Sequence, residues 1–395
     1  YQPFLPEAAA GNLEPRHLVV PLRRVLDKCE VLVGTVSRID HSARRVCFRP
    51  DEGAERDVSY DVLVLAPGSV AKTLPIPGLA ETGIAFRTVA EAIYLRNRVL
   101  SRLDLAAATD DPAVRERALH FLFVGGGYAG IEAIAELEDM ARDAMKLYPG
   151  LAESDMHWTM VEAAGRVLPE VSKDMAEYTV RQLESRNIKV RLNTRVESLV
   201  GGHVELSDGS RFDADTVVWT AGVRPNPLLE ASDLPLDDAK RVRCGANLRV
   251  LEVEQAWAAG DCAAVPDLSK DAEGALCGPT AQHAVRQAKR LGDNIVRSLR
   301  GEEPLDYRHA YAGSVASLGL HRGVAEVYGI KLKGLPAWWM HRTYHVARLP
   351  TFNRKLRVLA DWTLALFFRR EIVSLGSFSD PRRDFQRAAA PGPAK

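Results

Sequence analysis

Short apolar runs alternate with amphipathic stretches along most of this chain, which is the pattern of strands and helices that form a parallel sheet. The clearest run, 119–124, has the sequence Leu-His-Phe-Leu-Phe-Val and predicts a buried strand, and the stretch after it predicts a helix toward Tyr148. Further strands are expected at 156–161, 189–192 and 216–219, with a helix at 172–186. The pattern therefore predicts an α/β fold.

The rest of the chain predicts shorter elements. Strands are expected at 31–33, 46–48 and 61–66, a helix at 93–103, a polar linker at 106–117, a hairpin at 204–212, and a strand at 255–258 before a helix at 280–299. Two strand-to-glycine endings, 63–68 and 217–222, are similar in sequence. Two related dinucleotide-binding units, one split by the other, would produce this similarity.

Three glycines follow the strand at 119–124 in the order G-x-G-x-x-G, namely Gly125, Gly127 and Gly130. In a dinucleotide site the first permits a tight turn, the second lets backbone approach a pyrophosphate, and the third lets the helix pack close to the strand. The helix N-terminus adds free N–H groups and a partial positive charge. A close strand–helix turn without a ligand is the alternative, but three glycines at this spacing favour a dinucleotide.

An acidic residue, Glu162, follows the next strand at 156–161. A carboxylate there can accept hydrogen bonds from ribose hydroxyls and would repel a 2′-phosphate, so the sequence favours NADH over NADPH. Arg166 is close enough in sequence to keep NADPH as an alternative. A strand-end acid without a ligand is the other interpretation of Glu162.

Composition narrows the classes of function. The 395 residues contain 52 Lys and Arg against 52 Asp and Glu, so no basic excess points to nucleic acid. The five cysteines include no C-x-x-C pair, which supports neither a disulfide framework nor a metal site and favours a reduced, cytoplasmic setting. No apolar run reaches the ~18 residues that a membrane-spanning helix needs.

Several segments, in their order and spacing, resemble the type II NADH:quinone oxidoreductases, which are flavoproteins with two dinucleotide-binding domains. The segments are FLPEAAAG (4–11), PLR (21–23), LAPGS (65–69), GGGYAGIE (125–132), TAGV (220–223), AAGDCA (258–263) and PTAQHA (279–284). The resemblance implies two Rossmann-like domains, the FAD domain being split by the inserted NADH domain. It also implies that hydride passes from NADH to FAD and that two electrons then reach a membrane quinone without proton pumping.

The resemblance assigns roles to residues as well. Residues from three segments are expected to bind FAD: Ala66, Gly68, Ser69, Gly260, Asp261, Ala281 and Gln282. Asp261 would accept a hydrogen bond from a ribityl hydroxyl, although an Asx-turn or a helix cap is the structural alternative. Ala221 and Gly222 would let the nicotinamide ring stack on the flavin.

Two residues are expected in the catalytic site, Glu132 and Gln282. In the family the matching Gln lines the quinone pocket, and the matching Glu is proposed to help protons reach the quinone. The alternative for Glu132 is a carboxylate that only stabilises the positive end of a helix. The family often has a second Gln four residues after the first; here that position is Arg286, with Gln287 one residue later.

The implied domains are the first part of the FAD-binding domain at 1–113, the NADH-binding domain at 114–235, the second FAD part at 236–326, a membrane-associating helical region at 327–380 and a disordered tail at 381–395. Region 331–370 interleaves aromatic side chains with nine Lys and Arg and one acid, Asp361. Such helices lie in an anionic lipid interface, which predicts peripheral binding at the cytoplasmic face of the cell membrane. A homodimer interface is the alternative for this region, and nucleic acid is the partner it favours least.

The family also has a first strand–glycine turn–helix unit that holds the FAD pyrophosphate, and this N-terminal part of the FAD domain is expected to be missing here, either by truncation or by true absence. Two other functions remain open. A cysteine-dependent flavoprotein of the sulfide:quinone type would use Cys262 and Cys277. A membrane-attached, NAD-binding redox sensor would bind the nucleotide without turnover.

Overall fold

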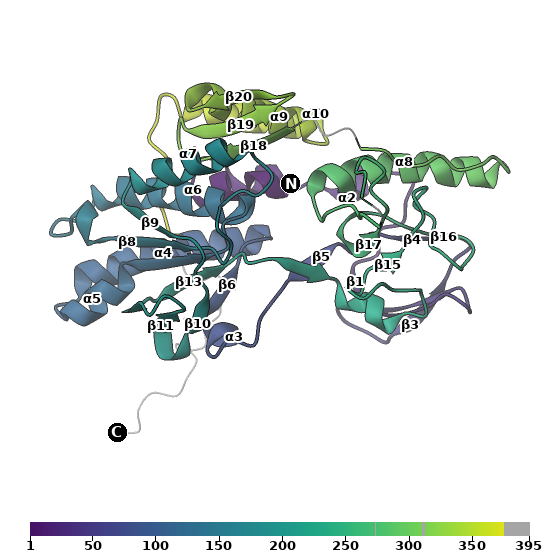
Figure 1. Cartoon of the computed structure of the whole chain (residues 1–395), viewed down its shortest axis with the longest axis horizontal. Coiled ribbons are helices and arrows are strands. Elements are labelled where there is room, and N and C mark those ends of the chain that lie inside the picture. Colours follow the sequence, from purple (N-terminus) through teal and green to yellow (C-terminus); the bar gives the residue numbers. More distant parts are fainter. Residues whose placement is uncertain (273, 310–312, 375–395) are drawn as a thin grey trace, which may run out of the picture. The chain divides into compact units, whose positions relative to one another are not determined.

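The computed structural model describes residues 1–272, 274–309 and 313–374, which form two compact units (Figure 1). Of these residues, the first unit contains Tyr1–Val20, Thr73–Ala221 and 313–374. The second contains 21–72, 222–272 and 274–309. Each unit has its own hydrophobic core, so each is described by itself.

A five-stranded parallel sheet lies at the centre of the first unit. Its order is β6 (Gly83–Ala85), β13 (Thr216–Trp219), β7 (His120–Val124), β8 (His157–Val161) and β9 (Ile188–Arg191). Every residue of β7 and β13 is buried, which explains their continuous apolar sequences. Because the strands are parallel, the chain segments that follow β7, β8 and β13 meet at one edge of the sheet.

The two faces of this sheet are covered differently. Phe121 and Phe123 of β7 share a core with the helices α4 (Val89–Ala108), α6 (Tyr128–Met145) and α7 (Lys173–Glu184). On the other face, Leu122 and Val124 pack against the antiparallel sheet β10 (Val196–Ser198), β11 (His203–Leu206) and β12 (Arg211–Asp213). In the view of Figure 1, α6 and α7 lie above the parallel sheet and β10 and β11 below it. Helices therefore cover one face of the parallel sheet and a second, antiparallel sheet covers the other.

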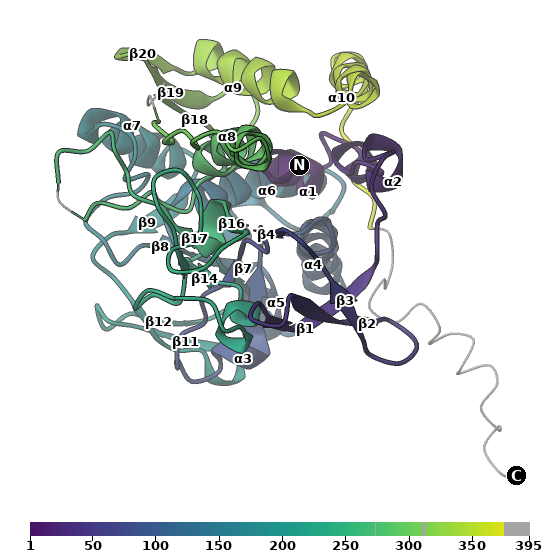
Figure 2. The same cartoon turned by 90° about the vertical axis from the view of Figure 1, so that its right-hand side faces the viewer.

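The C-terminal part of the first unit is an antiparallel sheet with two helices. The strands are β18 (Gly313–Ser317), β19 (Gly323–Val327) and β20 (Ile330–Lys333), and the helices are α9 (Leu335–Arg348) and α10 (Phe352–Leu364). Helix α9 packs on β18 and β19, and β18 packs on α6 (Figure 2). Helix α1 (Leu5–Ala9) contacts both α4 and α6.

The second unit is built from small sheets and one long helix. One sheet consists of three antiparallel strands, β1 (Gly34–Asp40), β2 (Arg45–Pro50) and β3 (Arg56–Ser59). Two further sheets have two strands each. In one, β4 (Leu63–Leu65) pairs in parallel with β16 (Ala256–Ala258), and in the other, β5 (Ser69–Ala71) pairs with β14 (Val223–Pro225). Helix α8 (Ala281–Leu299) packs beside the turn that follows β16. Short elements of this unit are α2 (Leu22–Val25), β15 (Val242–Arg243) and β17 (Ala263–Ala264), whereas α3 (Leu79–Thr82) and α5 (Pro112–Ala118) belong to the first unit.

Most expected elements are confirmed, among them the strands at 156–161 and 216–219, the hairpin at 204–212 and the helix at 280–299. The strand expected at 31–33 is wrong, because strand pairing starts only at Gly34. The polar linker expected at 106–117 is also wrong. Helix α4 continues to Ala108, and α5 starts after Asp111, whose carboxylate accepts a hydrogen bond from Ala113 N at 2.9 Å.

The two compact units divide the chain at different positions from the expected domains. Residues 313–326, for example, were expected in the FAD-binding domain but pack within the first unit. The expected domains follow nucleotide motifs rather than packing, and their limits stay a prediction. The expected disordered tail at 381–395 lies outside the described residues. Within the described part of the chain, no helix combines the length and apolar character that crossing a bilayer requires.

Candidate functional site

The three motif glycines of the first unit have three different surroundings. A Cβ on Gly125, whose φ is 112°, would lie 2.7 Å from the carbonyl carbon of Thr220, and a Cβ on Gly130 would lie 2.0 Å from the carbonyl oxygen of Gly125. No atom of the described chain lies within 4 Å of a Cβ built on Gly127. Gly125 and Gly130 therefore permit close backbone packing, whereas Gly127 leaves space at the N-terminus of α6, as a pyrophosphate site needs.

Glu162 lies beside this turn because β8 neighbours β7. Its Oε2 accepts a hydrogen bond from Gly126 N at 2.6 Å, and its Oε1 accepts one from Ala164 N at 2.7 Å. The Arg166 guanidinium donates instead to the carbonyls of Pro169 and Val171. A carboxylate rather than a guanidinium thus lies at the turn, which favours a free ribose 2′-hydroxyl over a 2′-phosphate.

The segment after β13 completes the edge of this sheet. Thr220 Oγ1 donates to the carbonyl oxygen of Gly125 at 3.0 Å and fixes the two neighbouring strand ends together. Ala221 and Gly222 follow, where the chain passes from the first unit into the second. Gly222 has a φ of 94°, and no described atom lies within 4 Å of a Cβ built on it.

In the second unit, the ends of β4 and β16 bring four of the expected FAD residues together. Because these strands are parallel neighbours, Gly68 and Ser69 after β4 lie beside Gly260 and Asp261 after β16. Ser69 Oγ donates a hydrogen bond of 2.5 Å to Asp261 Oδ2. Ala66 precedes this turn and is exposed. The Asp261 carboxylate has further lone pairs that can accept hydrogen bonds, and the Gly68 turn beside it is open. This arrangement suits the hydroxyl groups of a ribityl chain.

Helix α8 begins next to this turn with Ala281 and Gln282 in its first positions. Thr280 caps the helix, since its Oγ1 accepts a hydrogen bond from His283 N at 3.3 Å. Gln282 Oε1 accepts a hydrogen bond from Arg286 Nη1 at 3.1 Å. The positive helix end is suited to the charge of a reduced flavin, so the donor set of this unit fits FAD.

Gln287 has a structural contact that the sequence did not suggest. Its side chain is buried, and its Oε1 accepts a hydrogen bond from Gly260 N at 2.8 Å. This bond ties α8 to the turn that carries Asp261. Gln287 therefore holds the Gly260–Asp261 turn of the expected FAD site in place.

Glu132 is buried, and its carboxylate lies away from the glycine turn. Its Oε1 accepts a hydrogen bond from Ser317 N at 2.9 Å and lies 3.0 Å from His341 Nε2. An acid at the start of α6 therefore does not have to face an anionic pyrophosphate. His341 was not among the expected site residues, because nothing in the sequence shows which histidine of α9 lies toward α6.

The buried cysteines do not suit thiol chemistry. Burial raises the pKa of Cys262 to about 11 and that of Cys277 to about 11, so both remain thiols at neutral pH. A cysteine-dependent flavoprotein needs a reactive thiolate. The structure therefore does not favour this alternative.

Comparisons with known proteins agree with this geometry. Residues 1–288 match the family described as pyridine nucleotide-disulphide oxidoreductase. A Staphylococcus epidermidis protein named type II NADH:quinone oxidoreductase is 32% identical over 347 residues, covering 86% of this chain and 83% of the relative. A Dictyostelium discoideum protein named probable NADH dehydrogenase is 27% identical over 382 residues, covering 95% of this chain and 83% of the relative. The solved structure of NDH2 from Plasmodium falciparum in complex with NADH has the same fold, with a TM-score of 0.86 at 17% identity, over 94% of this chain and 92% of that one.

Proposed function

Because the chain belongs to the pyridine nucleotide-disulphide oxidoreductases and, within them, to the type II NADH:quinone oxidoreductases, we propose that it oxidises NADH with FAD and reduces a membrane quinone without pumping protons. NADH would bind at the turn from Gly125 to Gly130, with its ribose on Glu162. FAD would bind at the turns that carry Ser69 and Asp261. When bound, FAD would supply the redox chemistry between NADH and the quinone. The protein would hold the nucleotides and exclude side reactions.

One observation supports this proposal most strongly. Each unit places an open glycine and one carboxylate at the ends of parallel strands: Gly127 with Glu162 in the first unit, and Gly68 with Asp261 in the second. Each turn thus offers a carboxylate acceptor to the hydroxyls of one nucleotide. Gln282 would contact the quinone from the first turn of α8, and Ala221 with Gly222 would lie beside the nicotinamide.

The C-terminal helix α10 supports a lipid surface as partner. Its inner face is fixed by Val358 and Trp362, which are buried, and Trp362 Nε1 donates a hydrogen bond to Glu7 Oε2 at 2.9 Å. Its outer face exposes four large apolar side chains beside one basic side chain: Phe352, Leu356, Leu359 and Leu364, with Arg357. An apolar face with basic neighbours binds anionic lipid headgroups. Peripheral attachment at the cytoplasmic face of the membrane would bring the enzyme to its quinone, and a homodimer is the other use of this face.

Flavin content and turnover test the proposed function together. We expect the purified protein to show flavin absorbance and to oxidise NADH when a soluble quinone analogue is added. Asp261→Ala should lose most of the flavin, because it removes the carboxylate expected to hold the ribityl chain, while Asp271→Ala on an exposed loop should keep it. NADH binding without oxidation would favour the redox sensor and contradict the enzyme.

A further inference from the structure

Three side chains with metal-binding atoms meet in the second unit, and none of them is among the residues expected to bind FAD. They are Asp267, Cys277 and His283, and we call them the Asp–Cys–His cluster. A carboxylate oxygen, the sulfur and a ring nitrogen all lie within 4.8 Å of one another. Asp267 is 6% exposed and Cys277 is 5% exposed. The cluster is therefore an interior feature rather than a chance gathering of surface acids.

A short hairpin brings the first two members together. Residues 265–267 pair with 275–277 in the antiparallel sense, because Asp267 N donates to the carbonyl oxygen of Ala275 at 2.8 Å and Cys277 N donates to that of Val265 at 2.9 Å. Asp267 and Cys277 are diagonal neighbours in this pairing, so their side chains lie on one face. The sequence favoured no metal site, because ligands of the usual structural zinc sites lie only a few positions apart.

Helix α8 supplies the third member. Thr280 caps this helix, so His283 lies in its first turn. Tyr307 OH lies 3.0 Å from His283 Nδ1, and the ring of His309 packs on the His283 ring with the centroids 4.6 Å apart. The His283 ring is thus held on two sides. Histidines that bind a metal are oriented in the same way, by a partner on one ring nitrogen.

The other contacts of the cluster leave room for a cation. Cys277 Sγ lies 3.8 Å from the carbonyl oxygen of Pro266, which is a long contact even for sulfur. Asp267 Oδ1 accepts hydrogen bonds from Ser269 N at 3.2 Å and Ser269 Oγ at 2.6 Å, whereas Asp267 Oδ2 lies 3.3 Å from Lys270 Nζ. The Lys270 side chain is 59% exposed, so its ammonium group can turn to solvent at little cost.

The protonation of Cys277 is compatible with metal binding. Burial, followed by the charge of Asp267, raises the pKa of the Cys277 thiol to about 11. A metal ion deprotonates a thiol that coordinates it, and binding then releases the proton to solvent. The thiol proton is therefore exchanged for the metal and does not exclude it.

The ligand types select among metal ions. One sulfur, one imidazole nitrogen and one carboxylate oxygen suit Zn²⁺, whereas Ca²⁺ and Mg²⁺ take oxygen ligands. Zinc bonds of about 2.0–2.3 Å at tetrahedral angles place the ligand atoms about 3.3–3.8 Å apart. Because the three atoms already lie within 4.8 Å, shifts of about 1 Å bring them to these distances. Three protein ligands leave the fourth position to water.

We propose that Asp267, Cys277 and His283 bind one Zn²⁺ ion, with water as the fourth ligand. The ion would fasten the paired segments 265–267 and 275–277 to the first turn of α8. Its role is structural, because it holds the start of the helix that carries Gln282. The inference therefore goes beyond the proposed function and can fail or hold without it.

Zinc content and X-ray absorption of the whole purified protein test the inference. After incubation with ZnCl₂ and removal of the free ion, we expect about one zinc ion per chain, with one sulfur neighbour at about 2.3 Å. Cys277→Ser should lose this sulfur neighbour. Its affinity for Zn²⁺ should fall by at least about 100-fold, since loss of an outer-shell partner alone costs about 10–100-fold.

Cys244→Ser is the matched control. Cys244 is also buried in the second unit, but its thiol lies 3.5 Å from the carbonyl oxygen of Val242 and outside the cluster. This variant should keep the zinc content and the sulfur neighbour of the wild type. Zn²⁺ should also raise the Tm of the wild type and of Cys244→Ser but not that of Cys277→Ser, because an ion that binds only the folded chain stabilises it.

Tyr307→Phe tests how the site is positioned. It removes the hydroxyl group beside His283, so the sulfur neighbour should remain while the affinity for Zn²⁺ falls by about tenfold or more. A wild-type spectrum without a sulfur neighbour would overturn the proposal whether or not the variants fold. A sulfur neighbour that persists in Cys277→Ser would also overturn it, because the zinc would then lie on another cysteine such as the exposed Cys29.

Discussion

At the scale of single residues, Gly127 and Gly130 separate nucleotide binding from folding. Gly127→Ala adds a methyl group to an open position whose φ of −75° suits alanine, so we expect an unchanged Tm. The methyl group would keep the pyrophosphate away from the backbone. We therefore expect the KM for NADH to rise by roughly tenfold, which corresponds to the loss of about one hydrogen bond. Gly130→Ala places a Cβ 2.0 Å from the carbonyl of Gly125 and should cost about 1–3 kcal/mol of stability. Thermal unfolding and steady-state kinetics measure both, and equal effects on Tm would contradict these roles.

Glu162 should determine the choice between NADH and NADPH. Glu162→Gln keeps an acceptor for Gly126 N but removes the negative charge, so we expect the ratio of kcat/KM for NADH to that for NADPH to fall by roughly tenfold or more, as loss of a charged hydrogen-bond acceptor implies. Glu177→Gln on the exposed side of α7 is the control and should leave this ratio unchanged. If Glu162→Gln keeps the wild-type ratio of the two kcat/KM values, another residue determines the preference for NADH.

Residue types with fixed spacing could be found from the sequence, and residues placed by tertiary packing could not. The turn from Gly125 to Gly130 and the acid Glu162 depend on a local motif and on the next strand, so their positions follow from chain order. Gln287 and His341 depend on which side of a helix faces a distant segment. The hairpin that brings Asp267 beside Cys277 follows no local motif either.

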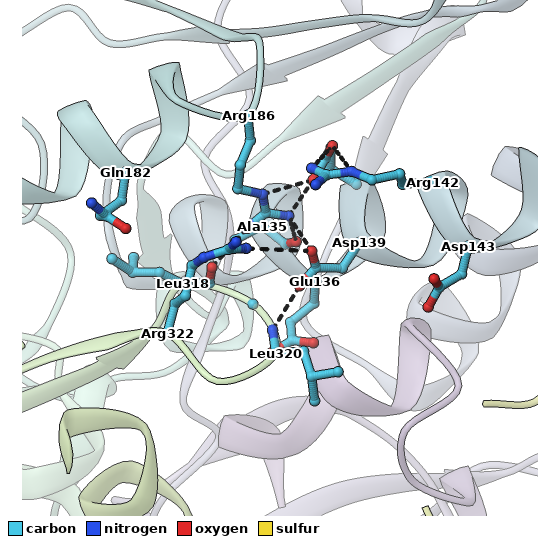
Figure 3. Close-up of polar contacts among 12 residues, drawn as sticks. Ala135, Glu136, Asp139, Arg142, Asp143, Gln182, Arg186, Leu318, Leu320 and Arg322 are labelled. Carbon is cyan, nitrogen blue, oxygen red and sulfur yellow. Dashed lines mark hydrogen bonds and ion pairs between the residues drawn. The ribbon is translucent and has the colours of Figure 1, made fainter. Parts of the chain in front are cut away.

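At the scale of elements, Arg186 should be essential for the packing of α6 against the turn between β18 and β19. Its guanidinium is buried, forms ion pairs with Glu138 and Asp139, and donates to the carbonyls of Ala135 and Leu318 at 2.6 and 2.7 Å (Figure 3). Arg186→Met leaves Glu138 with Arg142 and Asp139 with a longer contact of 3.9 Å to Arg322, and this loss of compensation should cost about 3 kcal/mol.

Chemical denaturation of two variants checks this expectation. The loss caused by Arg186→Met should exceed that caused by Arg186→Lys, because Lys keeps a positive charge beside Glu138 and Asp139. Arg181→Met, on the exposed side of α7, should change stability little. Equal losses in Arg186→Met and Arg186→Lys would indicate a packing defect rather than an electrostatic one.

The elements that the sequence predicted well are those with strong local patterns. The strand β13 and the helix α8 were located to within a residue or two, because their apolar runs and caps are clear. Helix α5 was missed although Asp111 and Pro112 form a usual helix start, because its sequence is polar and short. The β10–β12 layer on the sheet could not be foreseen, since alternation shows that a strand has a buried face but not what covers it.

At the scale of the whole molecule, attachment to a membrane should depend on the outer face of α10. Phe352 is 81% exposed and Leu356 57% exposed, so changing both to Gln removes little internal packing and should change the Tm little. Burial of a Phe or Leu side chain contributes about 1.5–3 kcal/mol, and partial burial of the pair should therefore account for at least roughly tenfold in binding to vesicles of anionic lipid.

Cosedimentation with vesicles of phosphatidylglycerol, compared with vesicles of phosphatidylcholine, measures this binding. The double variant Phe352→Gln with Leu356→Gln should bind more weakly, and added salt should weaken the wild-type protein further, because basic residues near the surface contribute about 1 kcal/mol each. Val200→Gln changes an equally exposed apolar residue outside α10 and should bind as the wild type does. If the double variant keeps full vesicle binding but dissociates a wild-type dimer, α10 is a subunit interface, and the quinone must reach the flavin from a membrane that another surface contacts.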